Sequence, residues 1–263
     1  MTRHTIYRKI IPLTVAVTIA VSLFAGCGRQ SSVDTVTVTE SKPDPITIEN
    51  SIPEPTVTPE PERVEEAVPD PADYFIAEEI SDDIFSRMKG KSFADGCTTP
   101  REDLRYLKLL YKDIDGNTCE GEMVCNERIA DKLTDIFRQL YEADYPIEKM
   151  VLIDEYNADD EASMSDNNTS CFNYRVVSGT TKLSKHSLGL AVDLNPRYNP
   201  YIHKIGGAEV VEPANGEAYA DRSNDFEYKI DKEDLAYKLF TDAGFTWGGS
   251  WKSMKDYQHF QYE

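Results

Sequence analysis

The residues whose types and spacing could do chemistry lie in the last third of the chain. His186 is followed seven residues later by Asp193, and Asp256 precedes His259 by three residues near the C-terminus. Neutral imidazole and carboxylate are ligands that zinc accepts, and three protein ligands leave a fourth position open in catalytic sites. We therefore predict a zinc site formed by His186, Asp193 and His259. Asp256 would lie close enough to exchange a proton with a water molecule there.

The first two ligands need a strand to position them. Residues 190–194 alternate large aliphatic side chains with Ala191 and Asp193, which is the two-residue period of a strand. If the aliphatic side chains face the core, Asp193 faces the other side of the sheet. Gly189 permits a tight turn or a close backbone approach just before this strand. His186 could then fold back over the Asp193 face.

A second strand is predicted at the C-terminus. His259 and Gln261 alternate there with the aromatic residues Phe260 and Tyr262. If this strand pairs beside residues 190–194, His259 reaches the same face as the other two ligands. The site therefore depends on two short strands that are far apart in the sequence.

Two motifs carry a resemblance to a known family. Residues 184–193 read Ser-x-His-x-x-Gly-x-Ala-x-Asp, and residues 256–260 read Asp-x-x-His-Phe. Together and in this order they resemble the VanY-type D-alanyl-D-alanine carboxypeptidases. Relatives of that family include L-alanyl-D-glutamate endopeptidases, and the wider group shares a fold with lysostaphin and the hedgehog signalling domain. The resemblance implies zinc as the cofactor and Asp256 as the carboxylate that takes a proton from water and returns it to the leaving amine.

The resemblance also implies roles beside the ligands. Arg175 is similar to the family arginine that faces zinc across the cleft, where a guanidinium would hold a developing oxyanion or a substrate carboxylate. A structural arginine is the alternative. Ser184 matches the family serine beside the first ligand and would bind substrate, or it would cap a turn.

Several other residues could contact a substrate. Trp247 and Trp251 flank a Gly-Gly turn and would either wall the cleft or belong to the core. The pair Asp159 and Asp160 could contact a substrate amine, although a solvated charge pair is the simpler interpretation. His203 lies in a segment that we predict to be a surface loop.

The scaffold is predicted to be an α+β domain, with helices against a small, mainly antiparallel sheet. It would resemble the hedgehog and D-Ala-D-Ala zinc peptidase fold. An Asp-Gly turn separates the first two predicted strands, and Asn126 is typical of a helix N-cap. Strands are predicted at residues 104–112, 122–125 and 150–153, and helices after Asn126 and from about Asp231 to Gly244.

The N-terminal sequence predicts that the chain is exported from the cytoplasm. Basic residues precede an apolar run at residues 10–24, which is too short for a comfortable membrane span. Residues 24–27, Phe-Ala-Gly-Cys, resemble a bacterial lipoprotein cleavage site, after which Cys27 would carry the lipid. An uncleaved anchor and an ordinary secretory signal are the alternatives. Each places the rest of the chain outside the cytoplasm, and we expect a lipid anchor in the bacterial cell membrane.

Composition divides the remaining chain in two. Residues 28–71 hold eight of the fourteen prolines and no aromatic residue, so we predict a disordered, semi-stiff tether. Residues 72–263 are enough for one domain with its own core, expected to be a monomer. The formal net charge of −19 argues against a nucleic-acid partner.

Four cysteines besides Cys27 lie in the predicted domain. Outside the cytoplasm an even number suggests disulfides, and four cysteines allow three pairings. Zinc binding by these cysteines and free buried thiols are the alternatives. The residues concerned are Cys97, Cys119, Cys125 and Cys171.

These observations favour a zinc-dependent peptidase of the cell envelope that hydrolyses peptidoglycan stem peptides. The most specific expectation is a D-alanyl-D-alanine carboxypeptidase. The alternatives are an L-alanyl-D-glutamate endopeptidase and a non-catalytic zinc-fold module that binds peptidoglycan. Asp256 argues against the binding module, since such a module has no use for a base beside an open metal position.

Overall fold

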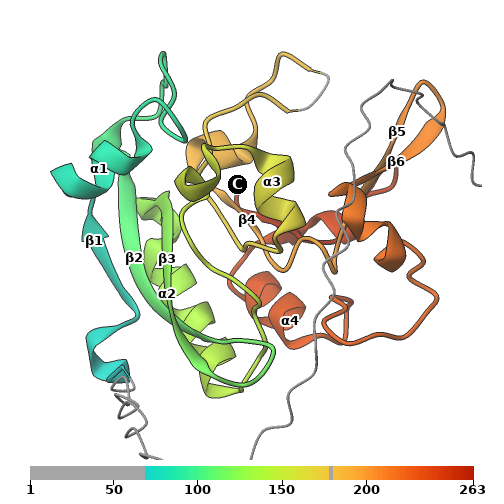
Figure 1. The fold of residues 1–263 in the computed structure, drawn as a ribbon, viewed down its shortest axis with the longest axis horizontal. Coiled ribbons are helices and arrows are strands. Elements are labelled where there is room, and N and C mark those ends of the chain that lie inside the picture. Colours follow the sequence, from blue (N-terminus) through green and yellow to red (C-terminus); the bar gives the residue numbers. More distant parts are fainter. Residues whose placement is uncertain (1–68, 178–179) are drawn as a thin grey trace, which may run out of the picture. The chain divides into compact units, whose positions relative to one another are not determined.

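The computed structural model describes residues 69–177 and 180–263, whose strands form three separate antiparallel sheets (Figure 1). The predictions for the signal segment, Cys27 and nearly all of the tether lie outside these residues. The strands are β1 (Ile76–Glu79), β2 (Leu104–Lys112), β3 (Thr118–Asn126), β4 (Ala191–Asp193), β5 (Tyr201–Ile205), β6 (Ala208–Glu212), β7 (Thr246–Trp247), β8 (Lys255–Asp256) and β9 (His259–Gln261). The α-helices are α1 (Asp82–Met88), α2 (Glu127–Glu142), α3 (Asp160–Ser165) and α4 (Leu235–Asp242).

The first sheet is a long hairpin with an added edge strand, in the order β1-β2-β3. β2 and β3 pair over their full lengths, and the turn between them is organised by the Asp113 carboxylate, which accepts the backbone N–H groups of Asp115 and Asn117. Asn126 ends β3 and caps α2, its side-chain oxygen accepting the N–H of Arg128 at 3.1 Å. This cap fixes the direction in which α2 leaves the sheet.

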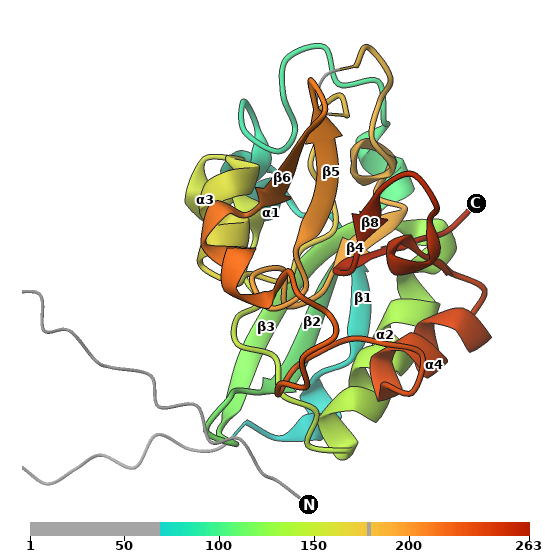
Figure 2. The same ribbon diagram turned by 90° about the vertical axis from the view of Figure 1, so that its right-hand side faces the viewer.

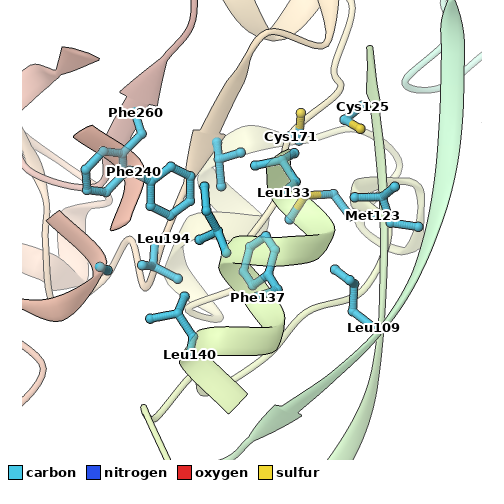
Figure 3. Close-up of a cluster of buried hydrophobic side chains, with 14 of the residues drawn as sticks. Leu109, Met123, Cys125, Leu133, Phe137, Leu140, Cys171, Leu194, Phe240 and Phe260 are labelled. Atoms are coloured by element: carbon cyan, nitrogen blue, oxygen red, sulfur yellow. The ribbon is translucent and has the colours of Figure 1, made fainter. Parts of the chain in front are cut away.

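α2 joins the first sheet to the C-terminal part of the domain. Its buried face packs on β2 and also contacts α4. In Figure 3 the α2 side chains lie between Leu109 and Met123 of the sheet and the aromatic pair Phe240 and Phe260. These two rings stack with centroids 4.3 Å apart. Burial of a large apolar side chain stabilises a fold by about 1.5–3 kcal/mol, so Phe260 anchors β9 firmly to this core.

The other two sheets share the C-terminal segment. One has the order β4-β9-β7 and the other β6-β5-β8. Figure 2 shows the β5–β6 hairpin, in orange, next to β8, in dark red. Because β8 and β9 follow each other in the chain but pair in different sheets, the short link between them ties the two sheets together.

Much of the predicted scaffold is confirmed. β2 matches residues 104–112, Asn126 is the N-cap of α2, and β4 and β9 pair as predicted. α4 begins four residues later than the predicted start at Asp231, because Asp234 accepts the backbone N–H groups of Ala236 and Tyr237 and so caps it.

Three structural predictions are wrong. Residues 150–153 form no strand; the amide of Asn168 instead bonds both the N–H and the C=O of Val151, where a neighbouring strand would have done so. A single sheet was also expected, whereas the described residues contain three. The predicted loop containing His203 is strand β5, and His203 is half-buried there beside Glu212.

The disulfide prediction is not met, since the four cysteines of the described residues are free thiols. Cys125 and Cys171 are buried in the main core. Cys97 and Cys119 pack against different hydrophobic clusters, which keeps them apart. Burial raises the pKa of Cys125, so this thiol remains protonated and behaves as a small apolar side chain. Within the described ranges no helix has the length and apolarity needed to cross a bilayer.

Gly189 is predicted to be indispensable to the turn before β4. Its φ is +65°, and a Cβ atom there would lie 2.6 Å from the backbone nitrogen of Asn126. Gly189→Ala should therefore lower the free energy of unfolding by more than the roughly 1–2 kcal/mol of left-handed backbone strain alone. Chemical denaturation of the metal-free protein measures this. Gly116→Ala, with φ +82° but open space around it, is the matched control for strain without the clash.

Candidate metal centre

Three buried side chains converge in the cleft. Ligand atoms of His186, Asp193 and His259 lie within 4.8 Å of one another. The Nε2 atom of His186 is 3.1 Å from one Asp193 carboxylate oxygen, and the Nδ1 atom of His259 is 3.0 Å from the other. The two ring nitrogens are 3.2 Å apart. The predicted strand pairing brings them together, since Asp193 on β4 lies opposite His259 on β9.

The opposite nitrogen of each imidazole faces an acceptor that fixes its tautomer. Nδ1 of His186 lies 2.6 Å from the carbonyl oxygen of Cys171, and Nε2 of His259 lies 3.2 Å from the amide oxygen of Gln261. Each of these nitrogens must therefore carry the proton and donate it. The lone pairs on the other two nitrogens then point toward the Asp193 carboxylate. Converging lone pairs repel each other unless a cation lies between them, so this donor set fits a metal ion.

In the metal-free protein, a proton on an imidazole compensates part of the negative charge of Asp193. Burial disfavours the charged carboxylate of Asp193, yet the two imidazoles hold its pKa well below the usual range. Burial likewise opposes the charge on His259, but the hydrogen bond from its ring to Asp193 raises its pKa. Protons and metal therefore compete for the same electron pairs, and acid should release the metal.

The first ligand is held by a short 3₁₀ turn, Lys185–Leu188. Ser184 caps this turn, its hydroxyl oxygen accepting the backbone N–H of His186 at 3.2 Å. At the other end, Gly189 approaches the start of α2, and its carbonyl oxygen accepts the N–H of Asn126 at 2.8 Å. Asn126, the residue that caps α2, therefore also holds the end of the turn that carries His186.

Asp256 lies in the same cleft, on β8 opposite Tyr201 of β5. Its Oδ1 atom is shielded from solvent and has no hydrogen-bond partner among the residues that the structure describes. Burial raises the pKa of Asp256 to about 7, and the nearby carboxylate of Asp193 adds to this effect. A carboxyl group that titrates near neutral pH can both accept and donate a proton under working conditions.

The cleft has a volume of about 380 Å³ and is lined by several of the other predicted residues. Arg175 and Ser184 both line it, so the structure brings them to the ligands. Trp251 also forms part of the wall, its ring centroid 5.4 Å from that of His259. Trp247 instead lies in the hydrophobic core and donates its indole N–H to the backbone carbonyl of Tyr257, so the core interpretation holds for it.

Sequence reasoning missed part of this cleft. Tyr201 and Glu212 reach it from the β5–β6 hairpin. The signal for that hairpin is the Gly206-Gly207 turn between two segments rich in β-branched and aromatic residues. Asp160 also lines the cleft, and no sequence pattern pairs it with Arg175.

The buried donor set is one that a metal-dependent hydrolase would use, and a comparison with protein families agrees. A family model described as D-alanyl-D-alanine carboxypeptidase matches residues 178–262. The matched segment contains the three convergent side chains and Asp256, and the resemblance drawn from the two motifs is thereby confirmed. No curated protein and no solved structure matches the chain.

Loss of one ligand should abolish tight metal binding. His259→Ala leaves one imidazole and one carboxylate, which make a weak site. We expect elemental analysis of the dialysed variant to show little or no bound zinc, whereas the parent retains about one ion per chain. His203→Ala removes a histidine that does not line the cleft and should keep the parent's metal content. Full zinc loading of His259→Ala would contradict the ligand assignment.

Proposed function

We propose that this protein is a zinc-dependent peptidase that hydrolyses peptidoglycan stem peptides, most specifically a D-alanyl-D-alanine carboxypeptidase. The observation that carries the proposal is a carboxyl oxygen of Asp256 that has no hydrogen-bond partner within residues 69–177 and 180–263. It lies in the cleft that holds the His186–Asp193–His259 cluster. The family description of the matched segment supports the substrate class.

His186, Asp193 and His259 would hold the zinc ion. When bound, zinc supplies a Lewis acid that polarises the scissile carbonyl and makes water more acidic. The donor set suits this ion, since two neutral imidazoles and one carboxylate leave a position open for substrate. The hydrogen bonds to Cys171 and Gln261 keep both imidazoles in the tautomer that binding requires.

Asp256 would move the proton. Its carboxylate form accepts one from the attacking water, and the resulting carboxylic acid donates it to the nitrogen of the leaving group. Arg175 would hold the negative charge that develops on the carbonyl oxygen, or the carboxylate of the substrate. Trp251 would exclude water from the side of the cleft next to His259.

The N-terminal sequence supports a place for this chemistry. We propose that Cys27 carries a lipid anchor in the bacterial cell membrane and that residues 28–71 tether the catalytic domain, as a monomer, within reach of the wall. Export would bring the cleft to its peptidoglycan substrate. This part of the proposal rests on the signal-like and proline-rich sequences alone.

Mass spectrometry of stem peptides incubated with the zinc-loaded protein tests the function. Loss of one terminal alanine is the expected result. An internal cut between L-alanine and D-glutamate would identify the endopeptidase instead. Tight binding of a peptide without any cleavage would favour the non-catalytic module and overturn the proposal.

Asp256→Asn should separate catalysis from binding. The substitution keeps the shape of the side chain but removes its ability to accept a proton, and Asp256 is not a proposed ligand. Zinc content and peptide affinity should survive, while kcat falls by about 10²- to 10⁴-fold, the usual contribution of general acid–base catalysis. Cleavage at the parent rate would show that another group serves as the base.

The raised pKa of Asp256 also predicts a dependence of stability on pH in the metal-free protein. An unfolded aspartate ionises near its ordinary pKa of 3.8, whereas Asp256 in the fold keeps its proton up to about pH 7. This stabilising contribution is complete below the lower value and is lost as pH rises through the higher one. Asp256→Asn should therefore gain stability over the parent at pH 8 but not at pH 4, by a few kcal/mol at most.

Urea denaturation in the presence of a chelator, at several pH values, measures this difference. Asp115→Asn, at the exposed turn between β2 and β3, is the matched control and should show no such trend. A constant difference between Asp256→Asn and the parent across the range would contradict the raised pKa.

A further inference from the structure

We propose that Asp160 is a positioning residue, which orients the guanidinium of Arg175 so that its two terminal nitrogens face the substrate. This inference rests on the proposed peptidase function and adds to it a residue outside the family match, since Asp160 precedes residues 178–262. It also gives a different role to a residue that the sequence suggested as a contact for a substrate amine.

Both oxygens of the Asp160 carboxylate are engaged. Asp160 is the first residue of α3 and lies half-buried in the wall of the cleft. One oxygen forms an ion pair with the Nε atom of Arg175, and the other accepts a hydrogen bond from the side-chain amide of Asn173 at 2.7 Å. Each oxygen of the Asp160 carboxylate therefore already has a protein partner, which holds the group in one orientation.

Asn173 connects this ion pair to the metal centre. It is buried, and its backbone N–H donates to the carbonyl oxygen of His186 at 3.2 Å. Its side-chain amide also donates to the carbonyl oxygen of Ala158 at 3.3 Å, just before α3. The carboxylate of Asp160 is therefore fixed relative to the segment that carries the first ligand.

The backbone of Arg175 is fixed to the same segment. Its N–H donates to the hydroxyl oxygen of Ser187 at 2.8 Å, and its carbonyl oxygen accepts the N–H of Ser184 at 3.0 Å. These bonds fix the backbone of Arg175 but not its long side chain. Without a partner, such a side chain samples many rotamers, and ordering it on substrate binding costs free energy.

The ion pair with Asp160 restricts the rotamers of the Arg175 side chain. It places Nε of Arg175 against the Asp160 carboxylate, while neither terminal nitrogen donates a hydrogen bond to any residue within 69–177 or 180–263. The terminal nitrogens form the planar fork that binds a carboxylate or an oxyanion through two parallel hydrogen bonds. Asp160 thus preorganises the fork, and preorganised donors stabilise a developing charge without reorganisation during the reaction.

Asp160→Asn tests the inference in the zinc-loaded full-length protein, with Asp159→Asn as the matched control. Asp159 is exposed, and it caps α3 by accepting the N–H of Ala162 at 2.9 Å, a task that asparagine performs equally well. We expect kcat/KM to fall at least tenfold in Asp160→Asn, with zinc content and melting temperature retained, and to stay at the parent value in Asp159→Asn.

A double-mutant cycle with Arg175→Lys distinguishes positioning from an independent role. Lysine cannot offer the fork, so Asp160→Asn should cause little further loss of kcat/KM in that background. Losses that multiply in the double variant, or parent-level kcat/KM in Asp160→Asn alone, would overturn the inference while leaving the proposed peptidase function intact.

A spectroscopic readout works even if the protein cleaves no peptide. The Nε–H group of an ion-paired arginine gives a shifted, slowly exchanging signal in ¹H–¹⁵N NMR, and Arg175→Lys identifies that signal by its absence. Asp160→Asn should move or broaden it, and Asp159→Asn should not. An inactive parent would defeat the proposed function alone; an unchanged Nε–H signal in Asp160→Asn would overturn the positioning role alone.

Discussion

Three sets of lone pairs aimed at one point constrain this domain more than any other interaction. The carboxylate of Asp193 and the unprotonated nitrogens of His186 and His259 would repel one another without a cation or proton between them. The fold must therefore supply the force that holds them together. It does so with apolar side chains on the opposite face of the strands, since Val192 and Phe260 are fully buried beside the ligands.

The segment from β8 to β9 determines where Asp256 lies relative to the ligand His259. β9 is bound to β4 and the core, whereas β8 is bound to the β5–β6 hairpin. Asp256 and His259 are thus close in sequence but anchored to different sheets. Their relative position is set by two sets of backbone hydrogen bonds, one between β9 and β4 and the other between β8 and β5.

The sequence was informative wherever a local rule decides the structure. The alternation of residue types correctly predicted that Val192 lies in the core and that Asp193 faces the cleft. The Asn126 side chain correctly predicted the start of α2. Local rules fail where a distant group replaces the usual partner. The amide of Asn168 takes the place of a strand beside Val151. Trp247 and Trp251 flank the same glycines, yet only tertiary packing sends one to the core and the other to the cleft.

The clustering of carboxylates in the cleft also couples the metal to the stability of the fold. Burial raises the pKa of both Asp160 and Asp256, and the nearby carboxylate of Asp193 raises it further in each case. In the metal-free protein these groups repel one another, which opposes folding. A bound divalent cation reverses the sign of that local interaction, so part of its binding energy becomes folding energy. The charges that oppose folding without a cation would therefore favour folding when one is bound.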